Sequence, residues 1–71
     1  MAERIRGAVK WFDPLRGYGF IRRKDGEDVF VHRTAVEHFG HPYLREGDEV
    51  EFEIEVGERG ANAVNVILVD S

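Results

Sequence analysis

Apolar and polar residues alternate with a period of two along Asp48–Val56. In an extended strand, successive side chains point to opposite faces, so one face would be apolar and the other acidic. The segment therefore predicts a half-buried strand with an acidic outer face. The apolar side comprises Val50, Phe52, Ile54 and Val56, and the acidic side comprises Glu49, Glu51, Glu53 and Glu55.

Four further segments read as strands. Ala61–Val69 is rich in β-branched residues, with Val64, Val66 and Leu68 expected on one face. Glycines 57 and 60 provide the turn that precedes it. The first half of the chain contains a proline that ends one strand and an Asp-Gly turn typical of a hairpin. The strands predicted there are Ile5–Asp13, Gly17–Arg23 and Asp28–His32.

Helical periodicity is missing from the whole chain, and residues 33–47 form the one long connection. We expect that connection to begin with a helical turn at Thr34–Glu37. Five short antiparallel strands within 71 residues predict an all-β fold, a small closed five-stranded antiparallel barrel. Closure removes exposed strand edges. A chain of this length predicts a single domain over residues 1–71.

The second and third strands separate aliphatic from aromatic side chains. Ile21, Val29 and Val31 fall on one face and are the natural core residues. The opposite face would carry Tyr18, Phe20, Arg22, Phe30 and His32. The reverse arrangement is disfavoured, because it would bury an arginine and a histidine and expose the aliphatic residues. Several rings on one solvent-facing surface indicate a binding site.

The first strand does not fit a strict alternation. Val9 and Trp11 would share a face, although Val9 suits the core and Trp11 suits the aromatic surface. A β-bulge near Lys10, or an early end of the strand before Pro14, would resolve the conflict. The sequence leaves both possibilities open.

Charge is distributed unevenly along the chain. The net charge of −4 does not favour a polyanionic partner, but residues 1–33 carry a net +3 and residues 34–71 a net −7. Lys10, Arg16 and Arg22 flank the aromatic face and could contact phosphates. Because every nucleobase can stack on a ring, exposed rings edged with cations favour single-stranded nucleic acid. Gly17 and Gly19 are interpreted as leaving the neighbouring rings unshielded.

Three segments, in this order, resemble the bacterial cold-shock proteins and the eukaryotic Y-box cold-shock domain: Lys10-Trp11-Phe12, Arg16–Ile21 and Val29–His32. The second is similar to the RNP1 motif and the third to the RNP2 motif. The resemblance extends over nearly the whole chain. It implies an OB-fold barrel that binds single-stranded RNA or DNA without a cofactor.

The resemblance also implies roles for individual residues. Lys10 and Arg16 would contact the strand, Arg59 would touch it from the last turn, and Asp28 would hydrogen-bond a base edge. Arg33 and His41 stand where the family usually has aromatic residues; we expect both to stack, and Arg33 to steepen the salt dependence of binding. The residues expected to stack on bases are Trp11, Tyr18, Phe20, Phe30, His32, Arg33 and His41.

Other chemistries find little support in the sequence. The chain has no cysteine, its only serine is Ser71, and we expect that the protein is not an enzyme. His32, His38 and His41 lie near Glu37, but we expect no metal site there. Gly17-x-Gly19 lacks the third glycine of a dinucleotide site.

The favoured function is that of an RNA chaperone, a protein that keeps transcripts unpaired by binding single strands. A role in transcription or translation during cold shock follows from the resemblance. We expect a cytoplasmic monomer with no membrane segment. The alternative is a protein-interaction module that uses the aromatic face, which titration with a short oligonucleotide would distinguish.

Overall fold

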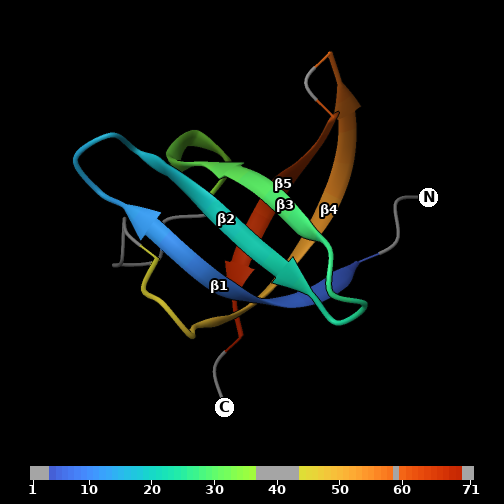
Figure 1. Ribbon diagram of the computed structural model, residues 1–71, viewed down its shortest axis with the longest axis horizontal. Helices are drawn as coiled ribbons and strands as arrows, with labels where there is room; N and C mark the ends of the chain where they lie inside the picture. The colour runs from blue at the N-terminus through green and yellow to red at the C-terminus, as the bar shows by residue number, and fades with distance from the viewer. Residues whose placement is uncertain (1–3, 37–43, 59, 70–71) are drawn as a thin grey trace.

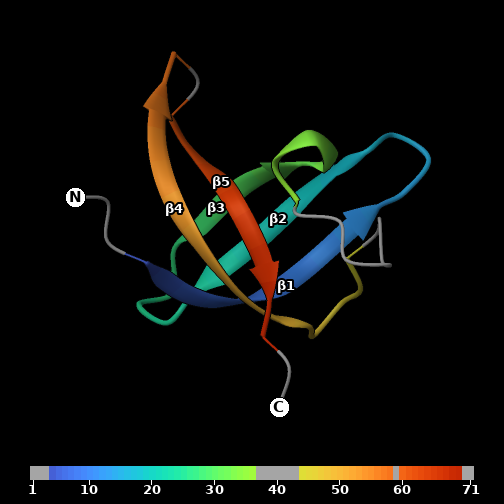
Figure 2. The same ribbon diagram turned by 180° about the vertical axis from the view of Figure 1, so that it is seen from behind.

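A closed five-stranded barrel makes up the fold in the computed structural model, which describes residues 4–36, 44–58 and 60–69 (Figure 1). The strands follow one another around the barrel in the order β1-β2-β3-β5-β4, and β4 pairs back with β1. Figure 2 shows β4 and β5 side by side on the opposite wall from β2. The elements are β1 (Ile5–Asp13), β2 (Tyr18–Arg23), β3 (Asp28–His32), the 3₁₀ turn η1 (Arg33–Ala35), β4 (Glu49–Gly57) and β5 (Gly60–Leu68).

The all-β class and the five-stranded closed barrel are confirmed. Four of the strand contacts are antiparallel, and β3 pairs with β5 in parallel through Phe30–Asn62 and Val31–Ala63. Because five is an odd number, the strands of a closed five-stranded barrel cannot all run antiparallel to both of their neighbours. At least one pair of adjacent strands must be parallel. The expectation that every strand is antiparallel is therefore met everywhere except at this short contact.

Strand boundaries follow the sequence patterns closely. The predicted limits of β1 and β3 match residue for residue, and those of the other three strands differ by one residue. Gly17 lies outside β2 because its φ of 78° belongs to a turn. The helical turn expected at Thr34–Glu37 is a 3₁₀ turn one residue earlier, at Arg33–Ala35. Glu37 lies outside the described residues.

Among the described residues, the fully buried side chains of the barrel interior are aliphatic apart from Phe52. As predicted, Ile21, Val29 and Val31 face inward with at most 1% of their surface exposed. Val50 and Phe52 of β4 are also fully buried, and Ile54 packs against the core. The buried set is Val9, Ile21, Val29, Val31, Val36, Leu44, Val50, Phe52, Ala63 and Val66.

Two details of the predicted apolar faces are wrong. Val56 is 80% exposed, because the end of β4 pairs with the start of β5 in a hairpin that projects beyond the barrel (Figure 1). Val64 does not share a face with Val66. A β-bulge places one extra residue in β5, where Asn65 has a φ of 52°, and this reverses the alternation. Ala63 and Val66 consequently point inward.

Candidate nucleic-acid interface

A β-bulge in β1 separates Val9 from Trp11. Val9 pairs with Ile21 of β2, and Trp11 pairs with the very next residue, Phe20, so Lys10 is the extra residue. Val9 is consequently buried, with 2% of its surface exposed, whereas Trp11 is 39% exposed on the outer face. Of the two possibilities that the sequence leaves open, the bulge near Lys10 is the one present.

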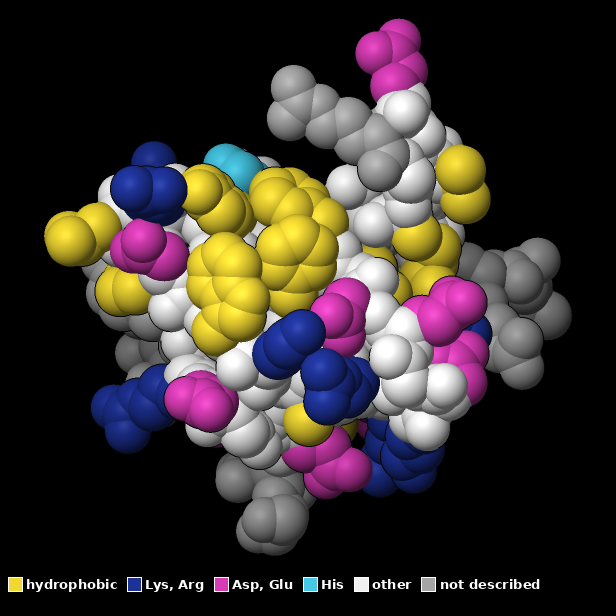
Figure 3. Space-filling model, viewed as in Figure 1, with side chains coloured by type: hydrophobic (Ala, Val, Ile, Leu, Met, Phe, Trp, Pro, Cys, Tyr) yellow, Lys and Arg dark blue, Asp and Glu magenta, His cyan; other side chains and the backbone are white. Residues whose placement is uncertain are grey.

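Five side chains form a continuous surface, here called the aromatic strip: Trp11, Tyr18, Phe20, Phe30 and His32. The β2–β3 register places Tyr18 opposite His32 and Phe20 opposite Phe30. Figure 3 shows these rings gathered on one face, with the histidine at the edge of the group. The strip lies on the outside of the barrel, as predicted.

The rings of the strip are spaced as interacting aromatic pairs. Trp11 lies 5.4 Å from Phe20 and 6.0 Å from Tyr18, measured between ring centroids. Phe30 lies 5.8 Å from both Tyr18 and Phe20. These separations fall within the range of favourable ring pairs, so the rings support one another's positions. The strip is therefore largely formed before any ligand binds.

The glycines of the RNP1-like segment have a different role from the one interpreted above. Gly19 alternates with the outward Tyr18 and Phe20, so it is buried on the inner face, where a Cβ would overlap the Trp11 carbonyl oxygen of β1. Gly17 adopts a positive φ, and the aliphatic stem of Arg33 lies against it. The idea that these glycines leave the rings unshielded is wrong. They permit close strand pairing and a tight turn.

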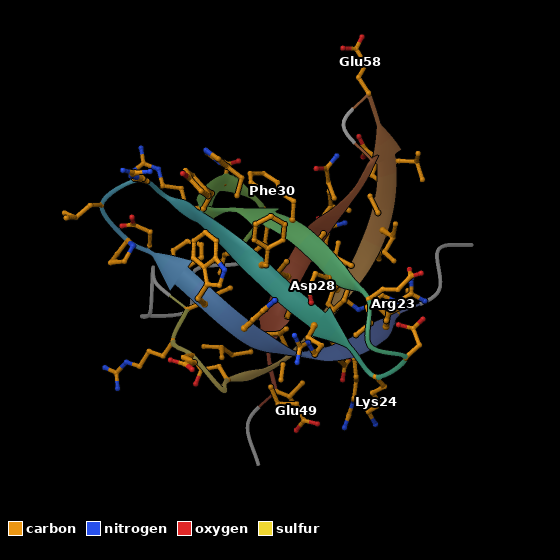
Figure 4. All side chains as sticks on the ribbon, in the orientation of Figure 1. Arg23, Lys24, Asp28, Phe30, Glu49 and Glu58 are labelled. Carbon is orange, nitrogen blue, oxygen red and sulfur yellow. The ribbon has the colours of Figure 1, made fainter. Side chains whose placement is uncertain are left out.

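One end of the strip carries a cluster of ion pairs. The Asp28 carboxylate accepts hydrogen bonds from Lys10 Nζ at 2.9 Å and from Arg22 Nε at 3.4 Å. Figure 4 shows Asp28 beside Phe30 on the same face. The hydrogen bond from Lys10, aided by Arg22, holds the pKa of Asp28 below its usual value. Both cations expected to contact nucleic acid here already share a carboxylate.

Asp28→Asn should reduce stability at neutral pH but not in acid. The folded-state pKa of Asp28 lies below its unfolded value of about 3.8. Its contribution is thus present above that pH and lost as the pH falls through the folded-state pKa. The group is exposed, so the effect should be small. Urea unfolding of the wild-type and Asp28→Asn proteins at pH 7 and pH 2.5 measures the effect. If their free energies of unfolding differ by the same amount at both pH values, the ionised Asp28 carboxylate does not stabilise the fold.

The other end of the strip carries Arg16, which has two side-chain partners, and Arg33. Arg16 Nη1 donates to the Tyr18 hydroxyl at 3.3 Å, and this contact raises the pKa of Arg16. Its Nε lies 3.7 Å from Asp13. Arg33 is exposed and has no carboxylate within ion-pair distance in the described part of the chain. The two ends of the strip therefore differ in electrostatic character.

The backbone ties Arg33 to the turn between β1 and β2. Its N–H donates to the Gly17 carbonyl at 2.8 Å, and the Gly17 N–H donates to the Asp13 carbonyl at 2.7 Å. The Asp13 carboxylate also accepts from the backbone N–H groups of Leu15 and Arg16. Asp13 is not among the residues predicted from the sequence to have a role, although Asp before Pro is a recognisable turn signal.

Ten of the twelve predicted site residues lie on or beside this face. His41 and Arg59, as well as His38, lie outside the described residues, so their roles stay predictions. Within the described ranges, no cluster of three His, Cys, Asp or Glu side chains could hold a metal ion. The same ranges contain no helix that is long and apolar enough to cross a membrane.

Comparison with known proteins shows one consistent family. The family described as the "'Cold-shock' DNA-binding domain" matches residues 5–69. The cold shock-like protein of Thermotoga maritima is 52% identical over 66 residues, which cover 93% of this chain and all of that protein. Cold shock protein CspB of Bacillus caldolyticus is 55% identical over 62 residues, which cover 87% of this chain and 94% of that protein.

A solved structure shares the fold. The chain described as Drosophila Unr CSD456 aligns with a TM-score of 0.81 at 24% sequence identity. The alignment covers 97% of the present chain but only 28% of that longer one. At this identity the similarity supports the barrel architecture alone.

Proposed function

Because this chain belongs to the family of "cold-shock" DNA-binding domains, we propose that it binds single-stranded RNA and DNA through the aromatic strip and acts as an RNA chaperone. The observation that carries the proposal is the strip itself: four exposed or half-exposed rings whose paired centroids lie 5.4–6.0 Å apart, with His32 beside them. Base stacking on such rings contributes about 1–3 kcal/mol per base.

Selectivity for unpaired strands follows from the same geometry. In a duplex, the faces of the bases are covered by their neighbours, so the strip can stack only on bases that are free. A protein that binds the open form and not the duplex shifts the equilibrium toward the open form by mass action. No nucleotide hydrolysis is required. We propose that this activity keeps transcripts unpaired and affects transcription or translation during cold shock.

The wider setting of the protein is also a proposal. The domain over residues 1–71 would act as a non-enzymatic cytoplasmic monomer. Phosphate contacts would come from Lys10, Arg16, Arg22 and Arg59, with Asp28 available to a base edge. Arg33 and His41 would extend the stacking surface. Family membership does not favour the alternative in which the strip binds another protein.

Titration with short oligonucleotides tests the proposed function. Trp11 is the only tryptophan and belongs to the strip, so its fluorescence should be quenched by hexamers of dT or U. Binding should weaken as salt rises, with log K falling by about 0.7 per log unit of salt for each neutralised phosphate. A matched duplex should bind much more weakly. No quenching at micromolar hexamer, or equal affinity for the duplex, would contradict the proposal.

A further inference from the structure

The histidine of the aromatic strip is held by a residue outside the strip. His32 ends β3, and its side chain caps the 3₁₀ turn η1 by accepting a hydrogen bond from the Thr34 backbone N–H. The His32 Nδ1 atom lies 3.2 Å from Thr34 N and 2.9 Å from the Thr34 hydroxyl oxygen. Both contacts are made by Nδ1, so they fix the orientation of the His32 ring through that one edge.

These contacts also determine where the ring proton lies. A backbone N–H can only donate, so Nδ1 must accept and cannot carry a proton of its own. The neutral ring then carries its proton on Nε2, at the edge away from Thr34. A proton on Nδ1 would point at the Thr34 backbone N–H. Two donors cannot hydrogen-bond to each other, so the bond that caps η1 would be lost. The geometry therefore favours the neutral Nε2–H tautomer.

Among the described residues, the charged side chains at the His32 end of the strip are Arg16, Arg33 and Asp13. Arg33 follows His32 in the chain, and Arg16 contacts Tyr18, which pairs with His32. Asp13, an acidic group at this end, is engaged by Arg16 and by the turn backbone. Within the described ranges, no carboxylate lies within ion-pair distance of His32.

We propose that Thr34 is a positioning residue that holds His32 as a neutral ring with Nε2–H available for donation, so that His32 meets nucleic acid by stacking and hydrogen bonding and not as a cation. The acceptor would be a carbonyl or phosphate oxygen of the strand. A ring that is already oriented loses less freedom on binding. The statement about binding rests on the proposed function, whereas the statement about the tautomer does not.

The tautomer is tested in the free protein by the ¹⁵N shifts of the histidine rings, with His32→Gln used to assign the signals. At pH 8 the wild-type protein and Thr34→Ser should show His32 as Nε2–H. Thr34→Val keeps the backbone N–H but lacks the hydroxyl, so only the longer 3.2 Å contact still holds Nδ1 as an acceptor, and the population should be more mixed. A wild-type ring protonated at Nδ1, or identical populations in all three proteins, would overturn the positioning role. Thr34 is exposed, and Thr34→Ala provides a second variant without the hydroxyl.

Affinity for a dT hexamer supplies the second readout. Thr34→Val should bind about two- to tenfold more weakly, and Thr34→Ser should restore the wild-type affinity. If Thr34→Val loses affinity without any change in the tautomer of His32, Thr34 has only a structural role, and the proposal is overturned.

Substitutions at the adjacent residues His32 and Arg33 compare the effect of losing a stacking ring with the effect of losing a cation. At pH 7.5, His32→Gln should weaken binding equally at every salt concentration, leaving the slope of log K against log salt unchanged. Arg33→Gln should flatten that slope by about 0.7. A flatter slope for His32→Gln would mean that His32 binds as a cation and would overturn the proposal. If the wild-type protein binds no hexamer, the proposed function fails, and the ¹⁵N measurement still decides the tautomer.

Discussion

Phe30→Ala should weaken the binding of single-stranded oligonucleotides by about 1–3 kcal/mol, or roughly 5- to 150-fold, with little loss of stability. Phe30, labelled in Figure 4, belongs to the strip. Its ring pairs with those of both Tyr18 and Phe20. Its neighbours Val29 and Val31 point into the core on the opposite side of β3. Removing the ring therefore takes away a stacking surface and leaves the barrel interior intact.

The same result is expected for Phe20→Ala, because Phe20 pairs with Phe30 and also contacts Trp11. Quenching of Trp11 by a dT hexamer at constant salt measures the affinity, and urea unfolding measures the stability. Val56→Ala is the matched control, since it truncates a side chain that is 80% exposed and does not belong to the strip. If either phenylalanine variant mainly unfolds, or binds like the control, the strip is not the binding surface.

The sequence predicts the barrel well because most of its strands follow a simple alternation. The aliphatic residues at 21, 29 and 31 and the rings opposite them leave only one sensible assignment of faces. The β5 bulge could not be predicted, because an extra residue such as Asn65 becomes evident only once β5 is paired with β4. Exposure of Val56 depends on where the barrel ends, which the alternation within β4 does not reveal.

Contacts at the ends of the strip are harder to predict than its rings. The ion pairs between Lys10, Arg22 and Asp28 join three strands and depend on the bulge that turns Lys10 outward. The bond between Thr34 and His32 requires a cap geometry that no strand pattern indicates. Composition identifies which residues can bind a nucleic acid. The register then determines which cations are already paired with a carboxylate before any strand arrives.

Gly19→Ala should destabilise the fold by about 3 kcal/mol or more, at the upper end of the range for overpacking. A Cβ at this position would overlap the carbonyl oxygen of Trp11 and lie 2.7 Å from the Cα of Phe12. Both obstacles are backbone atoms of the paired strand, so no side-chain rotation can relieve them. The strands β1 and β2 would have to separate where the strip is formed.

That loss is large for a protein of this size, because the net free energy of unfolding of a folded domain is only about 0.05–0.15 kcal/mol per residue. Gly57→Ala is the matched control: its Cβ would come no closer than 3.1 Å, to the side chain of Asn62, and its φ is not positive. It should change the free energy of unfolding by about 1 kcal/mol or less. Urea titrations of the two variants compare them directly. Equal stabilities would show that β1 can move away from β2 at little cost, in which case the rings that these strands carry are not rigidly placed.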